Sequence, residues 1–148
     1  MASSKDRPLL LDVNALMALA WPNHQFHTAV LERLGKQPAP LWATCALTQL
    51  GFVRLSSNPI IVEVRKTPAE AAGLLADLTR DRQHTYLEIL PALPQVARFF
   101  HHLLGHQQVT DAYLLAIAET NGATLLTLDR RMVPPGTTHA YVEVMKPP

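Results

Sequence analysis

The segment VTDAYLLAIAETNGATLLTLD (residues 109–129) joins a predicted helix directly to a predicted strand. Residues 112–120 are strongly apolar, with Thr110 ahead of them as an N-cap and an Asn-Gly pair behind them, which is typical of a helix end. Residues 123–128 form a short apolar run that stops at Asp129, as a buried strand does. The combination indicates an α/β fold with a central, mostly parallel sheet flanked by helices.

A similar unit lies near the N-terminus. Leu9-Leu10-Leu11 is a continuous apolar run that stops abruptly at Asp12, which predicts a second buried strand. Asn14 can then cap a helix over residues 15–20, which ends before a Trp-Pro pair. Strands that alternate with helices in this way belong to one parallel sheet.

The remaining elements are predicted from turn residues and apolar spacing. In Thr67-Pro68-Ala69-Glu70 the threonine is a cap, the proline suits the first helical position, and the glutamate completes a capping box. That helix is expected to turn four side chains inward, namely Ala72, Leu75, Ala76 and Leu78. Further helices are expected over residues 23–34, 47–55 and 92–104, and further strands over residues 41–44, 86–90 and 139–145.

Length and composition limit the class of protein. The 148 residues suit a single domain over residues 1–148, and 48% hydrophobic with 17% charged residues is typical of a folded globular chain. The net charge of +1 neither requires nor excludes a nucleic-acid partner. Cys45 is the one cysteine, which excludes an internal disulfide and a four-cysteine zinc site. The polar N-terminus does not resemble a signal peptide and no apolar run suits a membrane span, so we expect a cytoplasmic protein.

Three aspartates are expected to meet at one edge of the sheet. Asp12 and Asp129 each end a predicted strand, so in a parallel sheet both lie at its carboxyl edge. A helix packed on such a sheet runs antiparallel to the strands, which brings its N-terminus and Asp111 to the same edge. Open α/β sheets bind their ligands there.

The chemistry of three adjacent carboxylates favours a metal site. Taken singly, each aspartate has a structural explanation, as a cap, a favourable charge at a helix N-terminus or a turn residue. Together they repel, because two unit charges about 4 Å apart cost roughly 4 kcal/mol at an effective dielectric near 20. Mg²⁺ or Mn²⁺ relieves this repulsion, activates water and neutralises charge on a phosphodiester. The arrangement therefore predicts a metal-dependent nuclease.

Five segments carry a resemblance to a known family. They are LLLDVNAL (residues 9–16), WPNH (21–24), TQLGFVRL (48–55), VTDAYLLAIA (109–118) and LLTLDR (125–130). In this order and spacing they resemble the PIN domains, specifically the VapC-type toxins of bacterial toxin–antitoxin pairs. The likeness spans nearly the whole chain.

The resemblance implies a three-layer PIN-like fold and a Mg²⁺- or Mn²⁺-dependent endoribonuclease. Such a protein is the toxin of a type II toxin–antitoxin system; it cleaves single-stranded regions of RNA, forms a homodimer and is inhibited by a cognate antitoxin. Asp12, Asp111 and Asp129 take the family's catalytic and metal-binding positions. Asn14 and Thr127 match its supporting polar positions.

Gln49 departs from the family, which usually has a glutamate at this position. A neutral amide supplies no charge, so four carboxylates are reduced to three. A catalytically weakened PIN domain that binds RNA or a protein therefore stays open as an alternative. A haloacid-dehalogenase-like phosphatase is a further alternative, but it needs a second carboxylate two residues after the first, where this chain has Asn14.

Other polar residues have simpler explanations. His24 and His27 lack a nearby third ligand, and a structural zinc site needs four. Arg130 and Arg131 directly follow the last aspartate, so they are expected beside the acidic edge, where they can contact phosphates. An uncompensated carboxylate cluster can also accept a guanidinium or ammonium group from an inhibiting partner.

Overall fold

The computed structural model describes residues 6–64, 66–103, 105–132 and 139–147. Within these residues five parallel strands form one sheet, in the order β3-β2-β1-β4-β5. The strands are β1 (Leu9–Leu11), β2 (Trp42–Thr44), β3 (His84–Tyr86), β4 (Thr124–Thr127) and β5 (Val142–Val144). The expected parallel sheet is confirmed. None of the described helices is both long and apolar enough to cross a membrane.

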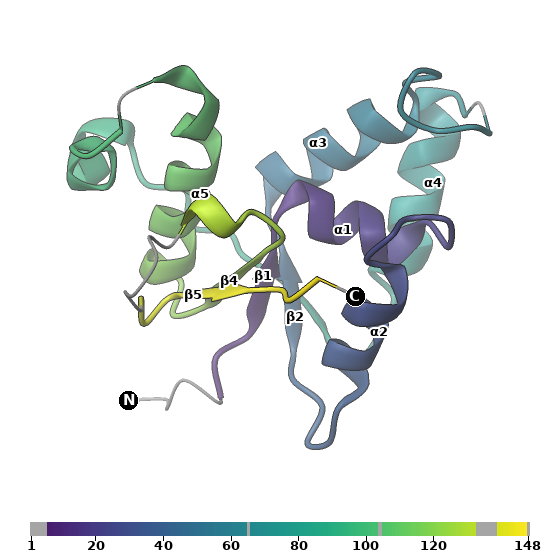
Figure 1. Cartoon of the computed structure of the whole chain (residues 1–148), viewed down its shortest axis with the longest axis horizontal. Coiled ribbons are helices and arrows are strands. Elements are labelled where there is room, and N and C mark those ends of the chain that lie inside the picture. Colours follow the sequence, from purple (N-terminus) through teal and green to yellow (C-terminus); the bar gives the residue numbers. More distant parts are fainter. Residues whose placement is uncertain (1–5, 65, 104, 133–138, 148) are drawn as a thin grey trace.

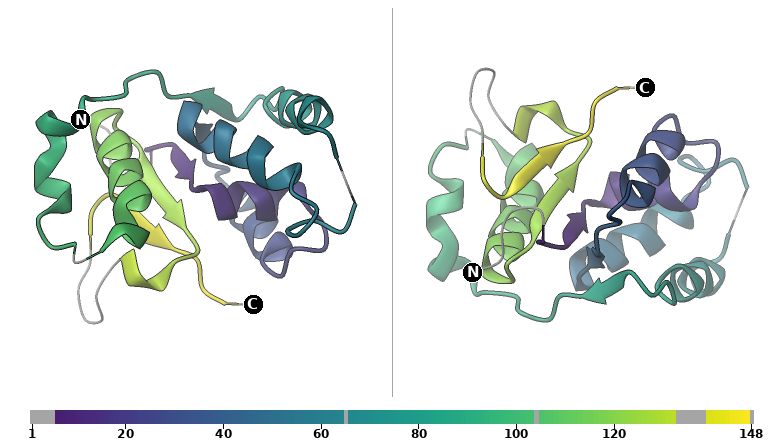
Figure 2. Two further views of the ribbon diagram at one scale, coloured as in Figure 1. Left: turned by 90° about the horizontal axis from the view of Figure 1, so that it is seen from above. Right: turned by 90° about the horizontal axis from the view of Figure 1, so that it is seen from below.

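Helices cover both faces of the sheet (Figure 1). The α-helices are α1 (Val13–Ala20), α2 (His27–Gly35), α3 (Ala46–Ser56), α4 (Pro68–Leu78) and α5 (Val109–Thr120). The described residues also form the 3₁₀ helices η1 (Leu93–Phe100), η2 (His106–Gln108) and η3 (Arg130–Met132). Figures 1 and 2 show α5 on one side of the sheet and α1 to α4 on the other. This is the three-layer α/β architecture of the sequence-based prediction.

Alternate residues of the inner strands contribute to two separate cores. Leu9 and Leu11 pack with α1 and α2 on one face, whereas Leu10 packs with α5 on the other. Leu126 and Leu125 divide between the faces in the same way, because successive side chains of a strand point in opposite directions. Burial on both faces explains why these strands are continuous apolar runs, since each buried leucine contributes about 1.5–3 kcal/mol.

The order in which strands are added to the sheet reverses between β1 and β4. From β1 it proceeds outward to β2 and β3, then returns through α5 to β4, on the other side of β1. The backbone N–H of Asp12 donates to the carbonyl oxygen of Leu126 at 3.0 Å and joins the two strand ends. Open α/β sheets bind ligands at such a switch point, so the topology selects the carboxyl ends of β1 and β4.

Helices α1 and α3 approach each other closely at Gly51. A methyl group at this position would lie 2.6 Å from Cγ2 of Val13, so the contact requires glycine. Val13 is the first residue of α1 and directly follows Asp12. This packing therefore helps to fix the helix start that carries the aspartate.

Two predicted N-caps are wrong. Asp12, rather than Asn14, caps α1, because Oδ1 of Asp12 accepts a hydrogen bond from the backbone N–H of Ala15. Asn14 lies inside the helix instead, as its second residue. Thr110 is also inside its helix, since η2 runs directly into α5 at Val109. The predicted end of α5 is confirmed by the glycine that follows it, which has a φ of 66°.

Helix α2 begins at His27, later than the predicted residue 23. The preceding residues form turns that side chains stabilise. Nδ1 of His24 accepts from the backbone N–H of Phe26 at 3.1 Å, and Nδ1 of His27 lies 2.7 Å from the carbonyl oxygen of Ala18. Both histidines thus bind backbone groups, in keeping with a structural role.

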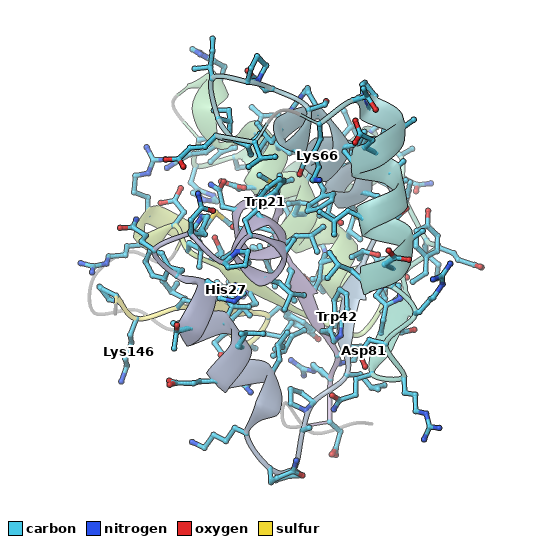
Figure 3. All side chains as sticks on the ribbon, turned by 90° about the vertical axis from the view of Figure 1, so that its right-hand side faces the viewer. Trp21, His27, Trp42, Lys66, Asp81 and Lys146 are labelled. Carbon is cyan, nitrogen blue, oxygen red and sulfur yellow. The ribbon has the colours of Figure 1, made fainter. Side chains whose placement is uncertain are left out.

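The strand expected over residues 86–90 is shifted to β3, which ends at residue 86. Tertiary contacts with β2 account for the shift. Nε1 of Trp42 donates to Oδ2 of Asp81 at 3.0 Å, and the Trp42 ring centroid lies 4.6 Å from that of His84. Figure 3 shows Trp42 beside Asp81. These contacts hold the chain against β2 just before pairing begins at His84.

Three other predictions need correction in extent or orientation. The helix expected over residues 92–104 is the 3₁₀ helix η1, interrupted by non-helical dihedral angles at Val96, and residue 104 lies outside the described residues. The strand expected over residues 139–145 is reduced to β5. Helix α4 has the predicted capping box, and Leu75 and Leu78 pack in the core as predicted, but Ala71 is buried, whereas Ala72 and Ala76 are exposed.

Candidate active site

Asp12 is the most deeply buried of the three aspartates, with 4% of its surface exposed. Its Oδ1 accepts from the backbone N–H of Ala15 at 2.7 Å, and its Oδ2 accepts from the hydroxyl of Thr127 at 2.6 Å. The donors come from α1 and β4, the two elements that meet at the end of β1. They fix the orientation of the carboxylate.

The surroundings of Asp12 disfavour the charged form of its carboxyl group. Burial raises the pKa of Asp12 to about 6, although the hydrogen bonds from Thr127 and Ala15 favour the charged form. Asp111 raises this pKa further, as a nearby like charge. Within the described part of the chain, no cation is among the groups that shift it. Hydrogen bonds, and no positively charged side chain among these groups, therefore stabilise the negative charge of Asp12.

Asp111 lies in the first turn of α5 and is half-buried. Burial raises the pKa of Asp111, and the charge of Asp129 raises it further, while Arg131 acts in the opposite direction. Asp111 thus interacts with both other aspartates. The structure brings the three residues to one edge of the sheet, where the topology predicts them.

Asp129 is held by Arg131. Nε of Arg131 lies 3.0 Å from Oδ1 of Asp129 and Nη2 lies 2.9 Å from Oδ2, which makes a two-pronged ion pair. The backbone N–H of Arg131 also donates to Oδ1, at 2.9 Å. These contacts lower the pKa of Asp129, with the guanidinium hydrogen bond as the main cause. The sequence predicts Arg131 beside the acidic edge but gives no sign of this pairing.

Thr127 connects the two strand-end aspartates. Its hydroxyl donates to Asp12 and accepts from the backbone N–H of Asp129 at 3.0 Å. The side chain is fully buried. A hydroxyl suits this position because one group must both donate and accept.

Asn14 and Gln49 lie outside this hydrogen-bonded group. Asn14 is exposed, and its side chain makes no hydrogen bond to the described residues. Gln49, on α3, is partly buried, and its Nε2 donates to Oγ1 of Thr44 at 3.0 Å. Thr44 ends β2, the strand next to β1, so Gln49 lies at the same edge of the sheet but is bound to a different strand.

Thr44 and His84 form a polar pair that the sequence analysis missed. Oγ1 of Thr44 lies 2.8 Å from Nε2 of His84. Because the Gln49 amide nitrogen can only donate, Thr44 accepts from it and can give its own hydrogen to His84. Burial lowers the pKa of His84, in keeping with a neutral acceptor ring. Thr44 could have been found as a polar residue that ends a strand, but His84 could not, because β3 was predicted elsewhere.

The donor set suits a hard divalent cation. Three carboxylates supply oxygen ligands, and the pKa values of Asp12 and Asp111 are raised by burial and like charge, which a cation would offset. In this conformation no three His, Cys, Asp or Glu side chains of the described residues are arranged to hold an ion. Asp129 differs from Asp12 in that both of its oxygens bond to a cation, the guanidinium of Arg131. The three carboxylates therefore suit a divalent cation chemically, but one of them, Asp129, is paired with the guanidinium of Arg131.

Comparison with known proteins gives consistent matches. A family model for the PIN domain matches residues 9–133, which include all three aspartates. Ribonuclease VapC39 of Mycobacterium tuberculosis is 39% identical over 121 residues, which cover 81% of this chain and 87% of that protein. Ribonuclease VapC38 of the same organism is 40% identical over 120 residues, with 81% and 84% covered. Its ribonuclease VapC44 is 34% identical over 140 residues, with 92% and 98% covered.

Proposed function

This chain belongs to the PIN-domain family, and on that basis we propose that it is a metal-dependent endoribonuclease, the toxin of a type II toxin–antitoxin system. The observation that carries the proposal is the meeting of Asp12, Asp111 and Asp129 at the sheet's carboxyl edge, where no cation is among the groups that shift the pKa of Asp12. Relatives named as ribonucleases, at 34–40% identity, support RNA as the substrate. In this proposal the chain forms a single domain and acts in the cytoplasm.

The three aspartates have different tasks in this proposal. Asp12 is a fixed ligand, because Thr127 and Ala15 hold both of its oxygens in place. Asp111 is more accessible and completes the site from the N-terminus of α5. When bound, Mg²⁺ or Mn²⁺ supplies a Lewis acid that stabilises charge developing on the phosphodiester. Arg130, exposed beside the site, adds positive charge for the phosphates of single-stranded RNA.

Two protein partners belong to the proposal. The first is a second copy of the chain, as a homodimer. The second is a cognate antitoxin that inhibits by placing an arginine or lysine on the acidic edge. The pairing of Asp129 with Arg131 supports the second point, since it is an example of a guanidinium accepted at this edge. Inhibition that survived replacement of every basic residue in the antitoxin's docking segment would refute that mechanism.

The proposal is tested by RNA cleavage in Mn²⁺ and in EDTA. Wild type should cleave a single-stranded RNA in Mn²⁺ and not in EDTA. Asp12→Asn, Asp111→Asn and Asp129→Asn should each abolish cleavage and stay folded, whereas Asp77→Asn, an exposed aspartate of α4, should have no effect. Full activity of the Asp12 or Asp111 variant would refute the assignment. Parallel assays on a phosphomonoester exclude phosphatase activity.

Gln49 supports one second candidate, a PIN domain that binds RNA or a protein without cutting it. The site has three carboxylates where the family usually has four, and one of these is paired with Arg131. Such a protein would bind single-stranded RNA with the same affinity in Mn²⁺ and in EDTA and leave it intact. The cleavage assay therefore separates the two candidates.

A further inference from the structure

The pairing of Arg131 with Asp129 is more complete than the local turn requires. The turn at the end of β4 is already closed by two hydrogen bonds from backbone N–H groups to side-chain oxygens, from Asp129 N–H to Thr127 Oγ1 and from Arg131 N–H to Asp129 Oδ1. The guanidinium adds contacts to both carboxylate oxygens, at 3.0 and 2.9 Å. Asp129 is therefore closed to other ligands on the side that faces Arg131.

The charge of Arg131 also reaches a second aspartate. Arg131 opposes the rise in the pKa of Asp111, and Asp111 in turn helps to raise the pKa of Arg131. Two of the three carboxylates thus share one cation, while Asp12 has none among the described residues. A divalent ion at the same edge would be repelled by the positive charge of Arg131 and would need the oxygens of Asp129 as ligands.

The guanidinium is able to leave. The side chain of Arg131 is 62% exposed, whereas that of Asp129 is 21% exposed. The two-pronged geometry makes this pair stronger than most surface ion pairs, but the exposed guanidinium regains its hydration when it leaves, which lowers the cost of displacing it. The aspartate would stay in place, because its backbone N–H remains bonded to Thr127.

We propose that Arg131 is an internal competitor of the metal: it holds Asp129 in the metal-free protein, and a divalent cation must displace it to complete the site. The inference rests on the proposed function, since it assumes the metal site of that proposal. It assigns Arg131 a positioning role that sets the metal affinity. The metal-free arrangement is then a closed state of the site rather than an incomplete one.

The test is a calorimetric titration of the full chain with Mn²⁺ at low ionic strength. Arg131→Gln should bind Mn²⁺ about fivefold more tightly than wild type, because Mn²⁺ no longer has to break the ion pair with Asp129. Two opposite unit charges about 4 Å apart in water attract by about 1 kcal/mol, which corresponds to this factor. The Mn²⁺ affinity of Arg131→Lys should lie between those of wild type and Arg131→Gln, because an ammonium group keeps the charge but cannot bond to both carboxylate oxygens in the two-pronged way of a guanidinium. The difference should shrink with added salt. Arg130→Gln is the matched control, since it removes the same charge from the neighbouring exposed residue.

The outcomes separate this inference from the proposed function. Equal Mn²⁺ affinities of wild type and Arg131→Gln, or equal gains in Arg131→Gln and Arg130→Gln, would overturn the inference alone, provided that Asp12→Asn abolishes binding. If neither wild type nor Arg131→Gln bound Mn²⁺, both the inference and the proposed function would be overturned. Binding by Arg131→Gln alone would support the competition most strongly.

Discussion

The hydroxyl of Thr127 lies 2.6 Å from Oδ2 of Asp12 and joins the ends of β4 and β1 at the candidate active site. The same oxygen accepts from the backbone N–H of Asp129. One buried threonine thus sets the relative position of two carboxylates from distant parts of the sequence. The switch point of the sheet makes this contact available, because β4 returns to the side of β1.

Thr127→Val should lower both stability and cleavage. The isosteric side chain leaves the Asp12 carboxylate without its closest donor and the Asp129 N–H without an acceptor. A lost hydrogen bond to a buried charged group costs about 1.5–3 kcal/mol. Urea unfolding at pH 8 in EDTA measures the stability, and Thr127→Ser, which restores the hydroxyl, is the control. Equal stability of the valine and serine variants would contradict this role.

The raised pKa of Asp12 predicts the pH dependence of the metal-free protein. Its value of about 6 in the folded state exceeds the ordinary value of 3.8, so the folded protein holds this proton more tightly than the unfolded chain. The contribution is fully present below pH 3.8 and is lost as the pH rises through 6. Ionised Asp12 should therefore cost about 3 kcal/mol at pH 8.

Asp12→Asn isolates this effect. In EDTA the variant should be about 2–3 kcal/mol more stable than wild type at pH 8, and the gap should narrow toward pH 4. The difference between the two proteins is the useful quantity, because His84, whose pKa is lowered, contributes a slope of opposite sign to both. A difference that did not change between pH 4 and pH 8 would show that Asp12 titrates normally.

Local pattern and sheet topology account for what the sequence predicts well. Leu9-Leu10-Leu11 and residues 124–127 are strands because both of their faces are buried, and such strands are continuous apolar runs. The meeting of the three aspartates follows from parallel strands and antiparallel packing of a helix. Both arguments use features that the chain carries locally.

The failures have both long-range and local causes. The position of β3 is set by Trp42, which binds Asp81 across 39 residues, and no local pattern encodes that contact. The cap of α1 is Asp12 rather than Asn14 because the helix starts as soon as the strand ends. The fork of Arg131 on Asp129 was missed because charged neighbours in sequence usually face solvent.

Gly51→Ala should destabilise the protein by about 1–3 kcal/mol, because the new methyl group overlaps Val13 between α1 and α3. Val13 is β-branched and cannot easily rotate away. Gly73→Ala is the matched control: it is a helical glycine of α4 with open space around it, and alanine should stabilise it by about 0.5–1 kcal/mol. Thermal unfolding measures both variants. Similar shifts of the same sign would refute a packing role for Gly51.

The last prediction concerns Gln49, which takes the family's glutamate position but binds Thr44 in the structure. In Gln49→Glu the new carboxylate can only accept, so Thr44 must donate to it and His84 must turn from acceptor to donor at Nε2. The added negative charge favours protonated His84, so its pKa should rise from its lowered value. Histidine NMR titration measures this without any metal.

The same variant tests whether Gln49 acts on the metal site. A fourth carboxylate at the sheet edge should tighten Mn²⁺ binding in calorimetry, and more so at higher pH, where the neighbouring carboxylates are ionised. Gln49→Ala removes the amide without adding charge, and loss of such a supporting contact commonly costs about 10–100-fold in metal affinity or activity. If His84 responds to Gln49→Glu while Mn²⁺ affinity is the same in all three proteins, Gln49 serves the β2–β3 pair alone. The family's acidic position would then have no functional counterpart in this chain.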